Sequence, residues 1–200
     1  MNTSTAGPVT ALDVKRGKQI ATIRDLLLRS KSQIEMAIPH HMNADRMLRV
    51  AMTSIQRNSL LMDCTPVSLL GAIMQSAQLG LEPDNLLGMA YLIPFWNSKK
   101  QCYEAQLQPG YKGLLKLARN SGEISTAQAR IVYAKDHFVY RFGLHPVLEH
   151  DPAAFAERGA PAFVYSILGL KDGGFQFEVM TAEEINAHRD RYSRAWQKDG

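Results

Sequence analysis

The stretch FVYSILGLKDGGFQFEVMTAEE, residues 163–184, combines local signals that together indicate the fold class. Apolar alternating runs lie on both sides of KDGG (residues 171–174), and an Asp-Gly pair between such runs predicts a tight antiparallel β-hairpin. Thr181, followed three residues later by Glu184, forms a capping box, so we expect a helix to begin there and to run toward Arg191. Strands and helices in separate blocks are typical of α+β proteins rather than of a doubly wound parallel sheet.

The sequence before this stretch predicts the same class. Thr65-Pro66 is a strong helix start, because a capping residue precedes a proline at the first helical position. The segment 67–79 that follows is apolar on nearly every side, so we expect a central buried helix that ends at Gly80. Asn43 is a good cap for a helix that runs to about Asn58. Helical spacing predicts one apolar face for this helix, made of Met47, Leu48, Ala51 and Ile55. Farther along we expect a hairpin over residues 89–107, a helix over 113–120 and alternating strands over 127–142. The predicted architecture is α+β, with N-terminal helices, a central β-hairpin and helix, antiparallel strands and a C-terminal helix, in a single domain with two lobes.

Two further expectations concern order and burial. Residues 1–21 mix polar and small residues without periodicity, so we expect a mostly disordered segment that precedes a folded domain over 22–200. Tyr140 lies between Phe138 and Phe142 on one strand face, which favours the core over a ligand contact. In the strand before it, one apolar face is predicted to consist of Ala127, Ala129, Ile131 and Tyr133.

The composition is that of an ordinary globular chain, with 200 residues of which 46% are hydrophobic and 21% charged. Two cysteines, Cys64 and Cys102, are too few for a secreted disulfide framework and suit a reducing compartment. No apolar run reaches the roughly 18 residues of a membrane span. We therefore expect a cytoplasmic protein without a membrane partner.

Positive charge is concentrated in two parts of the chain. Residues 99–141 hold eight Lys and Arg against three acidic residues, and residues 1–50 hold eight against four, while the remaining segments are net acidic. A basic stretch of this kind points first to nucleic acid. The alternative is a charged face that is merely solvated.

Several catalytic and metal-binding motifs are absent from the sequence. It contains no phosphate loop, no dinucleotide-binding glycine motif and no nucleophile elbow, and its histidines form no metal-binding pair at helical spacing. We therefore predict no catalytic residue, no metal site and no nucleotide hydrolysis. The candidate ligands for a cation are Glu82, Asp84 and a polar cluster of His145, Glu149, His150 and Asp151.

The basic centre of the chain also carries glycines and an aromatic residue at the predicted start of a helix. Gly110 and Gly113 allow a backbone to approach closely, and free N–H groups at a helix start favour phosphate. Lys112 adds a full charge beside them, and Tyr111 is suited to stacking on a base. The other interpretation, that these glycines only shape a loop, stays open.

Further cations extend this region. Lys112, Lys116 and Arg119 recur at positions i, i+4 and i+7 and so share one helix face. The residues predicted to contact nucleic acid are Gln108, Gly110, Tyr111, Lys112, Gly113, Lys116, Arg119, Arg130, Lys135 and Arg141.

Five stretches in order resemble the RecT family of phage-type single-strand annealing proteins. Individually each is weak, but their common order is specific. They are residues 39–42 (PHHM) with 46–47 (RM), 78–83 (QLGLEP), 87–95 (LGMAYLIPF), 110–113 (GYKG) with 117–119 (LAR), and 170–174 (LKDGG) with 177–181 (FEVMT).

The resemblance implies a DNA-binding recombination protein of a bacteriophage or prophage that anneals single strands without ATP. It implies homo-oligomeric rings or filaments on single-stranded DNA and on the annealed duplex intermediate. A 5′→3′ exonuclease and the host single-strand-binding protein are the implied partners, in the bacterial cytoplasm. No cofactor is implied as required, although Mg²⁺ is compatible with DNA binding. Family members also continue into a C-terminal basic segment that residues 22–200 lack.

Two other classes of function remain open from the sequence. One is a Mg²⁺-dependent nuclease acting on DNA through Glu82, Asp84 or the cluster between His145 and Asp151. The other is a structural or adaptor protein that oligomerises without binding DNA.

Overall fold

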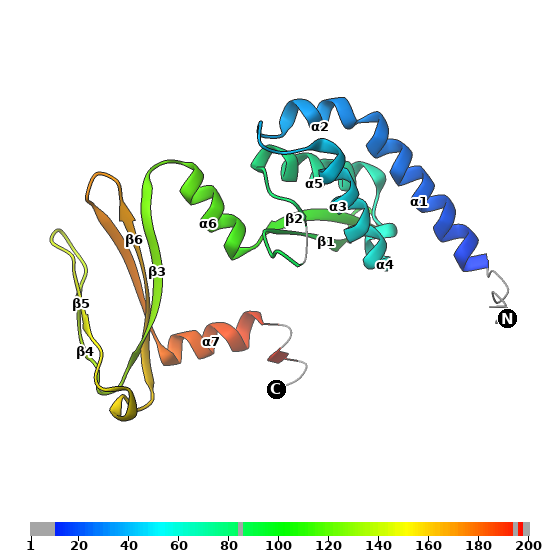
Figure 1. The fold of residues 1–200 in the computed structure, drawn as a ribbon. Coiled ribbons are helices and arrows are strands. Elements are labelled where there is room, and N and C mark those ends of the chain that lie inside the picture. Colours follow the sequence, from blue (N-terminus) through cyan, green and yellow to red (C-terminus); the bar gives the residue numbers. More distant parts are fainter. Residues whose placement is uncertain (1–10, 84–85, 194–195, 198–200) are drawn as a thin grey trace, which may run out of the picture. The chain divides into compact units, whose positions relative to one another are not determined.

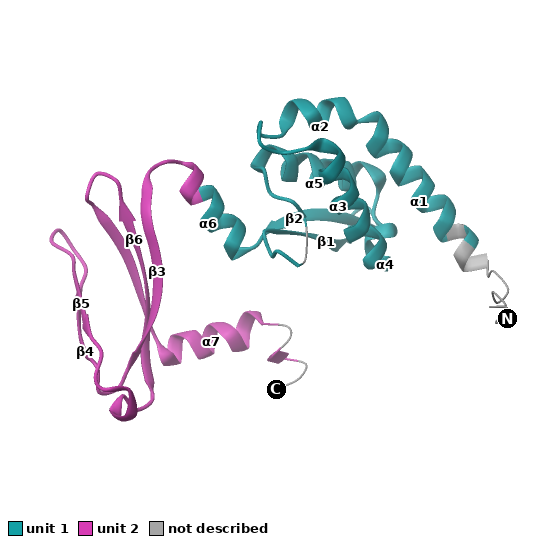
Figure 2. Cartoon of the chain, viewed as in Figure 1, with its two compact units in different colours: residues 1–117 teal, residues 118–200 magenta. Residues whose placement is uncertain are grey.

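A computed structural model describes residues 11–83, 86–193 and 196–197 (Figure 1). By its internal contacts the chain divides into two compact units, unit 1 up to Leu117 and unit 2 from Ala118 onward (Figure 2). Each unit contains helix and antiparallel strand, which confirms the α+β class and the two lobes. Among the described residues, no helix is both long and apolar enough to cross a membrane.

Unit 1 begins with helices whose starts match the capping signals. The Asn43 side chain accepts a hydrogen bond from Arg46 N at 3.0 Å, and the Thr65 side chain accepts one from Ser68 N at 3.3 Å. The helix after Thr65 ends at Gly80, whose φ of 63° lies in the left-handed region. These helices are α1 (Ala11–Arg29), α2 (Lys31–Ala37), α3 (Ala44–Arg57), α4 (Ser59–Met62) and α5 (Pro66–Leu79).

The core of unit 1 forms where the apolar faces of these helices meet. The α3 face predicted by helical spacing is buried, and α5 contributes Leu69 and Ile73, both with 0% exposure. The first residues of α5 do not follow the expectation of a helix buried on nearly every side, since Val67 is 80% exposed. The buried α3 residues are Met47, Leu48, Ala51 and Ile55.

The expected disorder of residues 1–21 is wrong from residue 11 onward, because α1 begins at Ala11; residues 1–10 lie outside the described residues. Ile23 and Leu27 are buried in the unit 1 core, and Ile20 packs against it. Once this packing nucleates the helix, each added residue forms a backbone hydrogen bond at little further cost, so the helix extends into a stretch with no apolar periodicity.

Unit 1 is completed by a β-hairpin and by a short helix whose last residues, from Ala118 onward, belong to unit 2. Strands β1 (Ala90–Asn97) and β2 (Cys102–Pro109) pair antiparallel, and α6 (Tyr111–Asn120) follows β2 directly. The hairpin is held to α5 partly by Ser68, whose hydroxyl accepts from Ala105 N at 2.9 Å. The hairpin and the helix were both expected, although α6 begins two residues before position 113.

Unit 2 consists of a three-stranded sheet, a separate hairpin and a helix. The sheet order is β3-β6-β7, with all neighbours antiparallel, and β4 pairs with β5. These elements are β3 (Ile124–Tyr133), β4 (His137–Arg141), β5 (Val147–Asp151), a 3₁₀ turn (Phe155–Glu157), β6 (Pro161–Leu170), β7 (Phe175–Thr181) and α7 (Ala182–Tyr192).

The signals that open the sequence analysis are confirmed in unit 2. Gly173, with a φ of 88°, lies in the tight turn between β6 and β7. At the start of α7, Glu184 N donates to Thr181 Oγ1 at 3.1 Å, and Thr181 N donates to Glu184 Oε2 at 2.8 Å, so both hydrogen bonds of the capping box form.

The β4–β5 hairpin packs aromatic side chains against the sheet. Phe138 stacks on Tyr165 with ring centroids 5.7 Å apart, and Tyr140 contacts Phe163 edge-on at 6.1 Å. Tyr140 therefore joins the aromatic packing, but 39% of it stays exposed, so the expectation that it lies in the core is wrong.

The apolar face predicted for β3 is wrong. Val132, opposite Phe163, is 1% exposed, whereas Ile131 is 46% exposed. Val132 and Phe163 share the face of the sheet that the β4–β5 hairpin covers, so β3 buries this face and not the predicted one. A register shift between Val132 and Tyr133 also interrupts the alternation along β3.

Replacing Ile73 by Ala should lower the free energy of unfolding of unit 1 by about 2–5 kcal/mol, because the substitution leaves a cavity beside a fully buried side chain. The measurement is urea denaturation followed by circular dichroism. Val67→Ala in the same helix is the matched control and should change the value by less than about 0.5 kcal/mol. Equal effects of the two substitutions would contradict the assigned core.

Candidate nucleic-acid interface

The two glycines at the start of α6 lie against the protein's own backbone. A Cβ on Gly110 would overlap the carbonyl oxygen of Gly88, and one on Gly113 would overlap that of Met89. Gly110 N also donates to Met89 O at 2.9 Å. The backbone that approaches these two glycines closely is therefore the protein's own segment leading into β1. This is the loop-shaping role that the sequence left open, and it fixes α6 on the hairpin.

The first turn of α6 projects polar and aromatic groups outward. Tyr111 is 70% exposed, Lys112 is exposed, and Gln108 is exposed just before them at the end of β2. Within the part of the chain that the structure describes, no acceptor takes the N–H groups of Tyr111 and Lys112. The turn thus offers two backbone donors, one ammonium group and one aromatic ring at the positive end of a helix.

Lys116, one turn farther along α6, already has a partner. Its Nζ donates to the carbonyl oxygen of Gly80 at 2.8 Å and so places a cation at the C-terminal end of α5. A lysine ammonium has three donors, so this contact leaves capacity for a second acceptor. Arg119, on the same helix face, is exposed.

The structure does not bring Arg130, Lys135 and Arg141, the predicted contacts on the strands and turns of unit 2, to one surface. Arg130 on β3 pairs with Tyr165 and so shares the sheet face that the β4–β5 hairpin covers in part. Arg141 is adjacent to Tyr140 on β4, and alternation directs it to the side opposite the rings that contact the sheet. Lys135 lies in the turn between β3 and β4.

The net charge differs between the units. Residues 1–117 contain thirteen Lys and Arg against eight Asp and Glu, and residues 118–200 contain ten against eleven. Unit 1 therefore has a net charge of +5 and unit 2 of −1. The attraction for phosphate is concentrated in unit 1.

A groove of about 390 Å³ lies beside α6 in unit 1 and was missed by the sequence analysis. Three of the stretches that carry the family resemblance meet in it, because the start of α3, the turn after α5 and the approach to β1 are neighbours in space. Its lining residues are His41, Met42, Asn43, Arg46, Glu82, Leu87, Met89 and Lys116.

An ion pair holds two sides of this groove together. Arg46 donates from Nε to Glu82 Oε1 at 2.6 Å and from Nη2 to Glu82 Oε2 at 3.0 Å. A two-pronged contact of this kind is among the stronger ion pairs, because both carboxylate oxygens accept from one planar group. The residues are 36 positions apart, and sequence spacing alone does not reveal such a pair.

The geometry gives the nuclease alternative no support. Glu82 is bound by Arg46, His150 is bound by Asp136, and Asp84 lies outside the described residues. Within residues 11–83, 86–193 and 196–197, no group of three His, Cys, Asp or Glu side chains could hold a metal ion.

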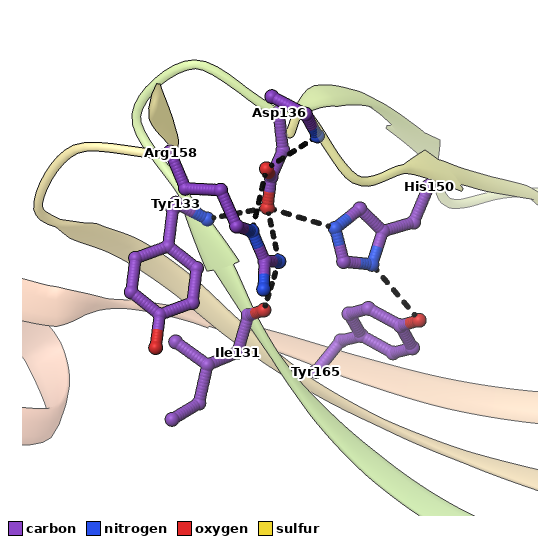
Figure 3. Close-up of polar contacts among 7 residues, drawn as sticks. Ile131, Tyr133, Asp136, His150, Arg158 and Tyr165 are labelled. Atoms are coloured by element: carbon purple, nitrogen blue, oxygen red, sulfur yellow. Dashed lines mark hydrogen bonds and ion pairs between the residues drawn. The ribbon is translucent and has the colours of Figure 1, made fainter. Parts of the chain in front are cut away.

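Unit 2 contains a buried polar network centred on Asp136, whose side chain has 0% exposure (Figure 3). The carboxylate joins the β3–β4 turn to β5 and to the loop before β6. The Arg158 guanidinium, followed by the backbone N–H groups and His150, holds the pKa of Asp136 well below its usual range. Its donors are Arg158 Nη2 at 2.6 Å and Nε at 3.0 Å, Tyr133 N at 2.9 Å, Ala153 N at 3.0 Å and His150 Nε2 at 3.1 Å.

His150 extends the network to the sheet, since its Nδ1 lies 3.2 Å from the hydroxyl of Tyr165 on β6. This role differs from the cation-binding cluster that was considered between His145 and Asp151. The network fixes the base of the β4–β5 hairpin against the sheet. The other members of that cluster, His145, Glu149 and Asp151, are exposed.

Comparisons with known proteins agree with one another. The profile of the RecT family matches residues 45–200. The chain is 44% identical over 161 residues to Protein RecT of Escherichia coli (strain K12), an alignment that covers 80% of this chain and 60% of that protein. It is 25% identical over 145 residues to the uncharacterized protein YqaK of Bacillus subtilis (strain 168), covering 70% of this chain and 48% of that protein. The chain thus spans about half to three-fifths of the length of these relatives.

Asp136→Asn should lower the melting temperature at pH 7 and weaken its dependence on acid. Because the folded-state pKa of Asp136 is depressed, its contribution is present above the unfolded-state pKa of about 3.9 and is lost as the pH falls below that value. The measurement is thermal unfolding between pH 7 and pH 3 for the wild type and the variant. Asp151→Asn, at an exposed position on β5, is the control and should follow the wild type. Identical acid profiles of wild type and Asp136→Asn would contradict the network.

Proposed function

Because the chain belongs to the RecT family, we propose that it binds single-stranded DNA and pairs it with a complementary strand without nucleotide hydrolysis. The proposal places the protein in the bacterial cytoplasm as a homo-oligomeric ring or filament. Its partners are then a 5′→3′ exonuclease and the host single-strand-binding protein. Mg²⁺ is compatible with DNA binding but is not required.

The observation that carries this proposal is the cluster of cationic groups around the segment Gly88–Met89. A Cβ on Gly88 would lie 3.9 Å from Lys112 Cδ, so the Lys112 side chain passes beside this segment. Lys116 and Arg46 line the groove on which Met89 borders. Lys112 and Lys116 of α6 therefore lie near one backbone segment in the unit that carries the net positive charge, and Arg46 of α3, paired with Glu82, lines the same groove.

Such a cluster suits the sugar–phosphate backbone better than a defined small ligand. Phosphate contacts carry no sequence information, so binding through them tolerates any strand. The donors at the start of α6 add two N–H groups for one phosphate, and Tyr111 places an exposed ring beside them. Gln108, Gly110 and Gly113 then belong to the interface through the backbone they position.

Four further cations lie beyond the first two turns of α6 and are proposed to make additional contacts with the DNA. Arg119, Arg130, Lys135 and Arg141 are exposed and available to phosphate. Arg130 lies on the sheet face that the β4–β5 hairpin partly covers, and Arg141 lies on the side of β4 that faces away from the sheet. We propose that they contact different segments of the DNA.

Lys112→Ala should weaken binding to all single-stranded sequences alike. Losing one phosphate contact should also reduce the slope of log K against log salt concentration by about 0.7. Fluorescence anisotropy with labelled oligonucleotides over a salt series measures both. Lys99→Ala is the charge-matched control, since Lys99 is exposed in the β1–β2 turn away from the groove lining. An unchanged slope for Lys112→Ala would remove Lys112 from the DNA path.

The function itself is tested by mixing two complementary oligonucleotides with the full chain in the absence of nucleotide. Faster duplex formation with full-length strands supports annealing. Shortened strands in the presence of Mg²⁺ would instead support a nuclease, and no binding at any salt concentration would support a structural protein. Light scattering on the same samples measures the oligomer.

A further inference from the structure

A row of aromatic rings at one end of unit 2 is left partly uncovered. Phe142 follows β4 and is 54% exposed, Tyr140 is 39% exposed, and Phe175 at the start of β7 is 41% exposed. Phe177 lies among them and is half-buried. Exposed aromatic rings that touch one another are unusual on a protein surface unless they bind a partner.

The planes of three of these rings are nearly parallel. Phe142 and Phe177 lie 20° apart in orientation with centroids separated by 5.1 Å, and Phe175 and Phe177 lie 15° apart with centroids separated by 6.1 Å. Tyr140 meets Phe142 edge-on at 5.7 Å. Phe142, Phe177 and Phe175 therefore form a stepped series of flat surfaces with a common orientation; we name these three rings and Tyr140 the aromatic row.

The aromatic row continues the buried aromatic packing of unit 2. Tyr140 contacts Phe163 and also Phe138, whose ring stacks on Tyr165. At the base of the same hairpin, the Asp136 network joins β5 to β6 through His150 (Figure 3). Because both ends of the hairpin are held, the exposed rings are positioned before any ligand binds.

We propose that the aromatic row stacks the bases of single-stranded DNA, an inference that rests on the proposed function. Each base has a flat π-face, so parallel rings can stack on any sequence. A neighbouring charged group fits a nucleic acid, because the exposed Lys171 lies in the turn before Phe175.

The energetic character of this site differs from that of the groove in unit 1. Residues 118–200 have a net charge of −1, so unit 2 as a whole does not attract phosphate. Stacking requires no ion release, and its contribution therefore persists at high salt. A variant of the row should lower affinity at every salt concentration by a similar factor.

Phe142→Leu and Phe175→Leu test this proposal, because each removes a ring and keeps an apolar side chain. Each should weaken the binding of an oligothymidine by about tenfold, with the salt slope unchanged. An abasic oligonucleotide of the same length, which lacks the bases but keeps the phosphates, should bind wild type and variants equally. Phe142→Trp should restore the affinity for the oligothymidine.

Phe155→Leu is the matched control, since Phe155 is 94% exposed in the 3₁₀ turn and contacts no ring of the row. It should bind as the wild type does, and circular dichroism should show that all variants fold. Equal losses on abasic and base-containing strands would overturn the stacking proposal, and so would wild-type affinity of both leucine variants.

The same set of samples separates this proposal from the proposed function. If Lys112→Ala loses affinity and the leucine variants do not, DNA binding stands and base stacking by the row is wrong. If the wild type binds no single-stranded DNA, the proposed function fails and the stacking proposal fails with it. If Phe142→Leu changes the mass by light scattering and leaves the difference between base-containing and abasic strands intact, a second copy of the chain covers the row and the proposal is overturned.

Discussion

The contact between α6 and the approach to β1 is the constraint on which the candidate interface depends. The carbonyl groups of Gly88 and Met89 fill the space that side chains would need at Gly110 and Gly113. Any larger residue at either glycine would push the helix away from the hairpin. The helix start then carries Tyr111 and its N–H donors in a fixed position. The groups offered to a ligand are therefore placed by a packing requirement that involves no ligand.

Asp136 has a similar part in unit 2. The unit has a small apolar core, and among its described residues only Val132 and Tyr165 are buried hydrophobic side chains. The Asp136 carboxylate accepts hydrogen bonds from two backbone N–H groups, a guanidinium and an imidazole. This buried network stabilises the unit where apolar packing is limited. Removing the carboxylate is costly, because its donors are then left without their acceptor. The network therefore explains how the β4–β5 hairpin is fixed against the sheet although few apolar side chains are buried between them.

The sequence predicts the features that depend on neighbours in the chain and misses those that depend on partners far along it. The caps at Asn43, Thr65 and Thr181 and the turn at Gly173 follow from backbone geometry within four residues, and all of them form. The burial of Val132 depends instead on the register of β3 with β6 and on a shift in that register, which the alternation of β3 alone does not contain.

The candidate interface likewise has features that neighbours in the chain determine and features that depend on distant partners. The exposed cluster at the start of α6 was predicted from a local motif, because a helix start with a lysine and an aromatic residue is recognisable in sequence. The ion pair of Arg46 with Glu82 and the contact of Lys116 with Gly80 each join residues 36 positions apart. The weak similarity of each stretch to a family was the only signal that these positions belong together, and their common groove gives that signal a spatial meaning.

The two proposed contacts with DNA use different parts of a nucleotide. Cations and N–H groups of unit 1 would hold phosphates, and the aromatic row of unit 2 would hold the faces of the bases. Neither contact occupies the hydrogen-bonding edges of the bases. An annealing protein has to keep those edges free, because they are what a complementary strand pairs with. A sequence-reading protein would instead direct amide or guanidinium groups to the base edges. The combination of a cationic groove with partly exposed rings is therefore the chemistry expected where one strand must be bound without being read and then offered to another.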